Sequence, residues 1–276
     1  MKLEQRDLSR LLETAIVAAR LAGQRAMEEI RFITTSVKSG EQLVTQADTL
    51  CQKIIIDRIK ETYPDHGFIA EEGPQGKIFK QQPRSSDGLW WIIDPIDGTN
   101  NFAHKVPIFT ISIAAMYQDR PVVGVIFEPS TDSMFTAVKD GYAQLNARRI
   151  TAGKEQMTPF ASVSLDSYFD ERVSGCIGEI MRRSRFRNLG TTSLHFACVA
   201  MGGFIAAIVC RPKLWDIAPG ALIVQAAGAV VTDWNGKGLF PVNLQEYNGE
   251  ELPAIAANKK VHTEILELLK PQPKTQ

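Results

Sequence analysis

Four acidic side chains stand where the sequence predicts that strands end and helices begin. Glu71, Asp94 and Asp97 each follow a short apolar run, and Asp216 stands at the start of a predicted helix. Such junctions are where α/β proteins place ligands. If the four carboxylates converge, their like charges repel, so some keep a proton unless cations bind between them. Oxygen ligands without histidine or cysteine favour Mg²⁺, Mn²⁺ or Ca²⁺ over zinc.

The segment 90–102, WWIIDPIDGTNNF, combines such a cation site with a site for an anion. Pro95 fixes φ in the turn between the two aspartates, and the Ile96 carbonyl offers a further oxygen ligand. Gly98 and Thr99 predict the start of a short helix, whose free N–H groups bind anions. Cations beside an anion site indicate a bound phosphate, and metal-assisted phosphoryl transfer to water requires little else.

Each of these signals has an ordinary explanation when it is taken alone. An isolated Asp-x-x-Asp is usually a solvated turn, the neighbours Glu71 and Glu72 read as a surface pair, and Asp216 reads as a helix cap. The four histidines are scattered and no nucleophile elbow accompanies them, so a Ser-His-Asp triad is not indicated. The chemical interpretation therefore depends on the combination of acidic residues.

Composition narrows the classes of protein that fit. The chain has 276 residues, 44% of them hydrophobic, which is enough for one large domain or two coupled ones. Its 31 basic and 31 acidic side chains give no net charge, which argues against nucleic acid as the main partner. The four cysteines lie far apart, so free thiols in a reducing cytosol are expected rather than disulfides or zinc. The polar opening MKLEQRDLSR does not resemble a signal peptide, and we expect a cytoplasmic protein.

Hydrophobic periodicity predicts helices first and then short strands in the N-terminal half. Helices are expected at 8–30 and 44–61, separated by a loop at 34–42. The predicted strands span residues 67–70, 89–93, 109–117, 122–127, 133–138 and 142–145. Asp140-Gly141 is a hairpin turn signal between the last two strands.

Strands and helices alternate in the C-terminal half, which predicts a layered α/β arrangement. The predicted strands span residues 161–165, 186–189, 204–210, 230–234 and 254–256. The predicted helices span residues 170–181, 191–201, 216–227 and 260–269. The uncharged run 196–210 is too short for a membrane span, so we expect it in the core. A polar stretch near residue 150 divides an α+β half (1–150) from an α/β half (151–276), with the active site expected between them.

Four segments together resemble the inositol monophosphatase family, in order and spacing, along nearly the whole chain. They are WIIDPIDGTNNF (91–102), LWDIAPGALIVQAAGAVVTDWNGK (214–237), IAEEG (69–73) and LVTQAD (43–48). The resemblance implies a mixed α/β fold, a layered α-β-α-β-α sandwich of the sugar-phosphatase type. It also implies a Mg²⁺-dependent and often Li⁺-inhibited phosphatase with two to three metal ions per site, usually a homodimer acting on a small phosphorylated substrate and not bound to a membrane.

The resemblance also implies a role for each matching residue. The first Mg²⁺ would be held by Glu71, Asp94 and the Ile96 carbonyl. The second Mg²⁺ would be held by Asp94, Asp97 and Asp216. Glu71 would also be a ligand of a third Mg²⁺ that binds more weakly. Thr99, hydrogen-bonded to Asp48, would orient the attacking water, so Glu71, Thr99 and Asp48 are the expected catalytic group. The expected substrate contacts are Asp97, Gly98, Thr99, Gly190, Thr191, Thr192 and Asp216, and Glu72 is expected to play only a supporting part.

Two departures from the family pattern concern the substrate and the packing. Family members that act on inositol phosphates often carry a glutamate where this chain has Val209, which cannot bond a substrate hydroxyl. Arg211 and Lys213 could instead meet a second anionic group, although surface solvation is the commoner role for such side chains. Ala229 replaces the second glycine of the A-G-G element, which we expect to be neutral.

The expected function is hydrolysis of a phosphate monoester, like that of an inositol-1-monophosphatase, by a metal-activated water. Fructose 1,6-bisphosphate, histidinol phosphate and 3′-phosphoadenosine 5′-phosphate are the alternative substrates. A non-catalytic regulatory or RNA-associated protein on the same fold is the alternative of another class. The intact acidic set argues against that alternative.

Overall fold

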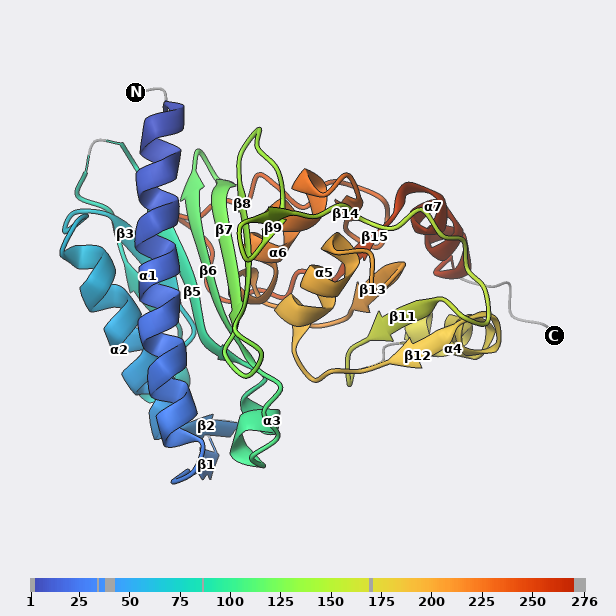
Figure 1. The fold of residues 1–276 in the computed structure, drawn as a ribbon, viewed down its shortest axis with the longest axis horizontal. Helices are drawn as coiled ribbons and strands as arrows, with labels where there is room; N and C mark the ends of the chain where they lie inside the picture. The colour runs from blue at the N-terminus through green and yellow to red at the C-terminus, as the bar shows by residue number, and fades with distance from the viewer. Residues whose placement is uncertain (1–2, 34, 38–42, 86, 169–170, 271–276) are drawn as a thin grey trace.

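The computed structural model describes residues 3–33, 35–37, 43–85, 87–168 and 171–270. Its elements stack in five layers, helix on sheet on helix on sheet on helix (Figure 1). The α-β-α-β-α sandwich expected from the sequence is therefore confirmed. Outer helices α1 (Gln5–Glu29) and α2 (Gln46–Lys60) cover the first sheet. The layer between the sheets holds α5 (Thr192–Ala200) and α6 (Leu214–Ala226).

The first sheet has eight strands in the order β10-β9-β8-β7-β6-β5-β3-β4. Neighbours pair antiparallel except β3 with β5, which run parallel. The strands are β3 (Gly67–Ala70), β4 (Phe79–Gln81), β5 (Trp90–Asp97), β6 (Thr110–Tyr117), β7 (Arg120–Glu128), β8 (Ser133–Val138), β9 (Gln144–Leu145) and β10 (Arg148–Arg149).

The second sheet has five strands in the order β12-β11-β13-β15-β14. Strand β11 runs parallel to both of its neighbours, and β15 runs antiparallel to both of its own. The strands are β11 (Ser162–Leu165), β12 (Arg185–Arg187), β13 (Ala206–Val209), β14 (Val230–Thr232) and β15 (Ala254–Ala257). Helices α4 (Glu171–Arg183) and α7 (Lys259–Leu268) cover its outer face.

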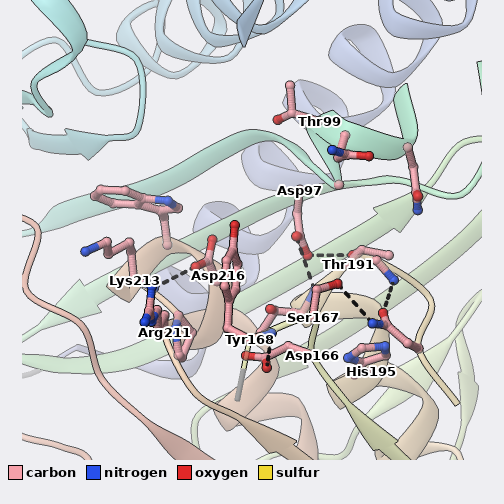
Figure 2. A pocket seen from close by; sticks show the side chains of 18 of the residues that line it. Asp97, Thr99, Asp166, Ser167, Tyr168, Thr191, His195, Arg211, Lys213 and Asp216 are labelled. Atoms are coloured by element: carbon pink, nitrogen blue, oxygen red, sulfur yellow. Dashed lines mark hydrogen bonds between the residues drawn. The ribbon is translucent and has the colours of Figure 1, made fainter. Parts of the chain in front are cut away.

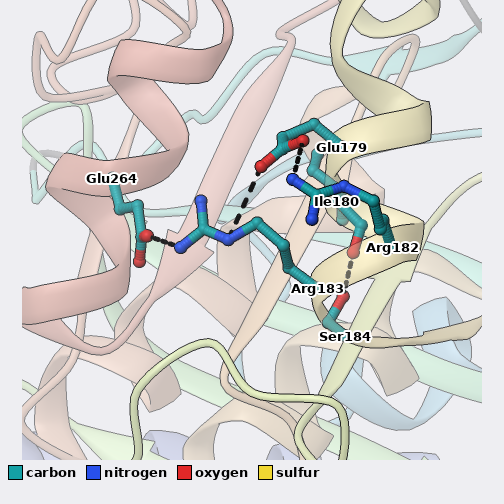
Figure 3. A network of polar contacts seen from close by, with 6 residues as sticks. All are labelled: Glu179, Ile180, Arg182, Arg183, Ser184 and Glu264. Atoms are coloured by element: carbon teal, nitrogen blue, oxygen red, sulfur yellow. Dashed lines mark hydrogen bonds and ion pairs between the residues drawn. The ribbon is translucent and has the colours of Figure 1, made fainter.

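A short ion-pair network links those two outer helices (Figure 3). Arg183 of α4 contacts Glu264 of α7, and its Nε lies 3.7 Å from Glu179 Oε1. Arg182 also pairs with Glu179, at 2.6 Å. The side chains of all four residues are between 31% and 71% exposed, so water screens them and each pair contributes less than about 1 kcal/mol. The apolar cluster beneath, with Val163, Ile208 and Ile265, is what fixes this layer.

Small side chains allow α1 to lie close to the first sheet. Its buried face is rich in alanine, and a Cβ on Gly23 would lie only 2.6 Å from a ring carbon of Phe127 on β7. The layer between the sheets is also apolar. There Ile126 of the first sheet and Val209 of the second belong to one cluster, so the core continues across residue 150. The division of the chain into two halves at that residue stays a prediction.

Strand β5 is buried along its whole length because both of its faces are covered. The sequence places Asp94 and Asp97 after this strand, and that expectation is wrong: both lie within it. A register shift between them pairs Asp94 with Ser112 and Asp97 with Thr110, so β5 has one residue more than β6 in this stretch. Pro95, which has no N–H to donate, falls inside that bulge.

Other predicted boundaries agree with the structure to within a few residues, with some exceptions. The loop expected at 34–42 contains β1 (Thr35–Val37), which pairs with β2 (Leu43–Thr45), while residues 34 and 38–42 lie outside the described residues. Helix α6 begins at Leu214, two residues earlier than expected. Asp170, the predicted start of a helix, also lies outside the described residues. The apolar run 196–210 is core, in α5 and β13, and no helix within the described residues combines the length and apolar character needed to cross a membrane.

Candidate active site

Three carboxylates converge at the junction of the first sheet and α6. Asp94 and Asp97 come from β5, and Asp216 comes from the first turn of α6. One carboxylate oxygen from each lies within 4.8 Å of the others, and Asp94 and Asp97 are nearly inaccessible to solvent. Side chains three apart on a regular strand point to opposite faces, so the extra residue of the bulge is what turns both aspartates to one side.

Asp97 joins the first sheet to α5. Its carboxylate accepts hydrogen bonds from the Thr191 hydroxyl at 2.6 Å and from the backbone N–H of Ser193 at 2.6 Å. The Thr192 N–H and the Ser193 hydroxyl donate to it as well. These N–H groups belong to the first turn of α5, where a helix stabilises negative charge. Asp97 is thereby held in one orientation by a segment almost a hundred residues away.

Asp216 is held in a similar way by its own helix. It is the third residue of α6, not the cap that the sequence indicated, and it accepts the Lys213 backbone N–H at 2.6 Å. Asp48 stands at the corresponding position of α2 and accepts the Thr45 backbone N–H at 2.8 Å. The Thr99 hydroxyl lies 3.2 Å from Asp48 Oδ1 and 3.0 Å from the Ile96 carbonyl oxygen, and it donates toward both.

Burial and mutual repulsion raise the pKa values of these acids. Burial is the main cause at Asp94, and the charges of Glu71, Asp97 and Asp216 raise its pKa further, well above the ordinary value. Burial and then the charge of Asp97 raise the pKa of Asp216 to about 7. Burial raises the pKa of Asp97 as well, although its bonds to Ser193 and Thr191 oppose the rise.

The donor set fits a hard divalent cation. Burial and the neighbouring carboxylates raise the pKa values of these acids, and Mg²⁺ or Ca²⁺ would bind such groups in place of the protons. Glu71 lines the same pocket and its charge acts on Asp94, but it lies outside the group of three whose oxygens meet within 4.8 Å. The Ile96 carbonyl accepts the Thr99 hydroxyl and keeps a second lone pair. Metal binding by the five residues expected from the sequence stays a prediction. They are Glu71, Asp94, Ile96, Asp97 and Asp216.

The acidic cluster opens into a pocket of about 550 Å³ (Figure 2). Segments far apart in the sequence line it. They comprise Glu71 and residues 97–101 and, further along the chain, residues 166–168, 188, 190–192, 195, 211–213, 215, 216 and 251. Gly98 and Gly190 both have positive φ, and a Cβ on Gly98 would lie 3.2 Å from the Gly190 carbonyl oxygen. Glycine at these two positions lets the two halves meet at the pocket.

Several residues of the site are given no role by the sequence analysis. The Asn101 side chain donates to the Leu189 carbonyl at 2.7 Å and to the Ile108 carbonyl at 2.8 Å. The Leu189 N–H donates to His195 Nε2 at 2.9 Å. Ser193 was also missed, although it gives Asp97 two hydrogen bonds. Polar residues beside the predicted Gly190–Thr192 segment are the only hint that the sequence offers.

Val209 stands where some family members carry a glutamate. It is fully buried on β13, belongs to the apolar cluster between the sheets and is absent from the pocket lining. Arg211 and Lys213, two and four residues later, do line the pocket. The part of the wall next to Asp216 is therefore cationic.

The match to known proteins extends over almost the whole chain. The model of the inositol monophosphatase family matches residues 7–273. The chain belongs to the inositol monophosphatase family. A curated relative, the Nus factor SuhB of Pseudomonas aeruginosa, is 31% identical over 273 residues, covering 95% of this chain and 96% of that one.

Two further family members were compared. The fructose-1,6-bisphosphatase/inositol-1-monophosphatase of Thermotoga maritima is 34% identical, with 84% of each chain covered. The crystal structure of the extragenic suppressor protein SuhB from Bartonella henselae has a TM-score of 0.84 and 28% identity, covering 96% of this chain and 100% of that one. The relatives of this chain therefore include proteins named as phosphatases and proteins named as Nus factors.

Proposed function

We propose that this protein is a Mg²⁺-dependent phosphate monoester hydrolase that acts on a small polyol or sugar phosphate, like an inositol-1-monophosphatase. The observation that carries the proposal is the Asp94–Asp97–Asp216 cluster, buried at Asp94 and Asp97, which opens into a pocket large enough for a small molecule. Three acids held so close together repel one another, so a cation between them is the simplest reason for the arrangement.

The proposed roles come from the family pattern, and contacts of the chain support some of them. Glu71, Asp94, Asp97, Asp216 and the Ile96 carbonyl would hold the metal. When bound, Mg²⁺ would neutralise the acids and the phosphoryl oxygens and lower the pKa of a water. The Thr99 hydroxyl directs its proton to Asp48 and Ile96, so its oxygen is left to accept a hydrogen bond from the attacking water. Burial raises the pKa of Asp48 to about 6, so above that pH it is the ionised acceptor that this arrangement needs.

The phosphate would lie beside the Gly98 and Thr99 N–H groups and the Gly190–Thr192 segment. Gly98 is conformationally suited to this close approach because its φ is 101° and it has no side chain. Two or three Mg²⁺ ions per site, inhibition by Li⁺, a homodimer and a cytoplasmic location form the rest of the proposal. The first three rest on the family, and the location rests on the composition of the sequence.

Phosphate release from a panel of substrates tests the proposal. The panel comprises inositol 1-phosphate, fructose 1,6-bisphosphate, histidinol phosphate and 3′-phosphoadenosine 5′-phosphate, each with Mg²⁺ and with EDTA. We expect release from at least one substrate with Mg²⁺ and none with EDTA. No release from any of them would favour the alternative of a non-catalytic protein, the reading suggested by a relative named as a Nus factor.

A further inference from the structure

Helix α2 carries two buried polar side chains that bond to segments at the edge of the pocket. They are Asp48, in the first turn of the helix, and Gln52, four residues later, with exposed fractions of 0% and 6%. Residues four apart lie on the same face of a helix. Asp48 accepts the hydroxyl proton of Thr99, whereas Gln52 bonds to the segment that follows β3. One face of α2 therefore contacts two separate parts of the site.

Gln52 holds both backbone polar groups of Glu72. Its side-chain oxygen accepts the Glu72 N–H at 2.9 Å, and its side-chain nitrogen donates to the Glu72 carbonyl at 2.5 Å. A side-chain amide offers the same donor and acceptor as a peptide group. Gln52 therefore pairs with Glu72 much as a residue of a neighbouring strand would.

This contact begins where the pairing of β3 ends. The last residue of β3, Ala70, pairs with Ile93 of β5, and the N–H of Glu71 lies 3.3 Å from the Ile93 carbonyl oxygen. The next residue, Glu72, bonds to the side chain of Gln52 instead. Glu71 is thus held on one side by β5, the strand that carries Asp94 and Asp97, and on the other side by α2.

We propose that Gln52 is a positioning residue that sets where the Glu71 carboxylate lies relative to Thr99. The inference rests on the proposed function, in which Glu71 binds metal and Thr99 orients the attacking water. Both residues line the pocket. Asp48 fastens Thr99 to α2, and Gln52 fastens the peptide that follows Glu71. The two fastening points are about 6 Å apart along the helix axis, a spacing that the regular helix keeps constant.

A role in stability alone is the alternative explanation for Gln52. A buried amide is hydrogen-bonded wherever it stands, so its removal lowers stability under either role. The melting temperature therefore does not distinguish the two roles. The affinity for Mg²⁺ and kcat do distinguish them, because they respond to the position of Glu71.

The variant Gln52→Met tests the inference, since methionine has a similar length and forms neither bond. Calorimetric titration with Mg²⁺ alone should show an affinity about 10- to 100-fold lower, the usual cost of losing the support behind a metal ligand. At saturating Mg²⁺, kcat should fall at least about tenfold. The KM for the phosphate ester should change by less than about twofold, because the proposed phosphate contacts at Gly98 and residues 190–192 are untouched.

Two further variants at this position refine the test. Gln52→Glu has the same length and keeps an acceptor for the Glu72 N–H, so it should recover at least part of both losses. Gln52→Asn keeps the amide but is one methylene shorter, and it should resemble Gln52→Met. If Gln52→Met does not fold, as judged by circular dichroism, Gln52→Asn takes its place with the same expectation.

Asn258 provides a matched control, because it forms the same kind of contact outside the pocket. Its side chain donates to the Glu155 carbonyl at 2.9 Å and accepts the Val261 N–H at 3.1 Å, and it is 5% exposed. Asn258→Leu should lower the melting temperature, as Gln52→Met does. It should leave the Mg²⁺ affinity and kcat unchanged.

The outcomes separate this inference from the proposed function. If Gln52→Met lowers only the melting temperature, or raises KM without lowering kcat, the positioning role is overturned. If the unmodified protein binds Mg²⁺ but releases phosphate from no substrate, the proposed function fails, and the Mg²⁺ titration still decides the role of Gln52. If the unmodified protein does not bind Mg²⁺, both fail.

Discussion

Asp94 is the side chain whose environment departs most from that of a free carboxylate. It is 2% exposed, its Oδ1 accepts the N–H of Ile96 at 3.0 Å, and three other acids act on it. An asparagine of the same shape would remove the charge while filling the same space. A substitution by asparagine at this position therefore distinguishes the effect of the Asp94 charge from the effect of its packing.

We predict that Asp94→Asn lowers phosphate release at least about a hundredfold, because even residues that only support metal ligands cost 10- to 100-fold when they are changed. Calorimetric titration with Mg²⁺ should show a matching loss of affinity. Asp132→Asn, an exposed acid that pairs with Arg20 away from the pocket, is the control and should behave normally. Near-normal turnover in Asp94→Asn would rule out the proposed role of Asp94.

The same residue scale shows what the sequence can predict. Asp94, Asp97, Gly98 and Thr99 are consecutive or nearly so, and in combination with Glu71 and Asp216 they predict a metal site and a phosphate site. Asn101, His195 and Ser193 could not be found, because their roles depend on backbone groups that only folding brings to them.

At the scale of elements, the segment that leads into α5 is held from two sides. The side chain of Asn101 on α3 (Thr99–Ala103) holds the Leu189 carbonyl, and His195 on α5 accepts the Leu189 N–H. Burial lowers the pKa of His195 to about 4, so the ring is neutral and its Nε2 is free to accept that bond. Asn101 and His195 are therefore positioning residues, since they orient the donors that bind Asp97.

We predict that Asn101→Ala weakens Mg²⁺ binding about 10- to 100-fold, the usual cost of losing the support behind a metal ligand. Calorimetric titration with Mg²⁺ gives this affinity without turnover. The helix content by circular dichroism should not change, because Asn101 lies in a helix of five residues. Unchanged Mg²⁺ affinity would mean that the segment before α5 holds Asp97 without this clamp.

The elements themselves were largely predictable, because their apolar periodicity is strong. The bulge in β5 was not, since it reflects a mismatch of one residue with β6 that no local pattern encodes. That mismatch determines the geometry of the acidic cluster, as it brings Asp94 and Asp97 to one side. Pro95 was the nearest signal, because a residue without an N–H is tolerated inside a strand mainly at bulges and edges.

At the scale of the whole molecule, the acidic cluster works against folding unless it is neutralised. Asp94 and Asp97 come from the first sheet and Asp216 comes from the layer between the sheets, so their repulsion acts across the packed layers. The pKa values of Asp48, Asp94 and Asp216 are all raised in the folded protein. The folded state therefore holds more protons than the unfolded state between the ordinary value of 3.8 and about 7.

The free energy of unfolding must then fall as pH rises through that window, because the unfolded state binds fewer protons than the folded state. We predict that, in EDTA, the melting temperature falls between about pH 5 and about pH 8, and that added Mg²⁺ raises it more at the higher pH, where protons no longer compete. Thermal unfolding followed by circular dichroism provides the measurement, with and without Mg²⁺ at each pH.

The variant Asp216→Asn isolates the cause. It should flatten the pH dependence in EDTA and lose most of the stabilisation by Mg²⁺, whereas Asp132→Asn should follow the unmodified protein. His66, whose pKa is lowered by burial, acts in the opposite direction because its contribution to stability is lost as pH falls below about 6.5. His66 is present in both proteins, so its contribution cancels when the melting temperature of the variant is subtracted from that of the unmodified protein at each pH. Equal pH dependence in the two would show that the acidic cluster is not under strain and would remove the main physical reason for placing a cation there.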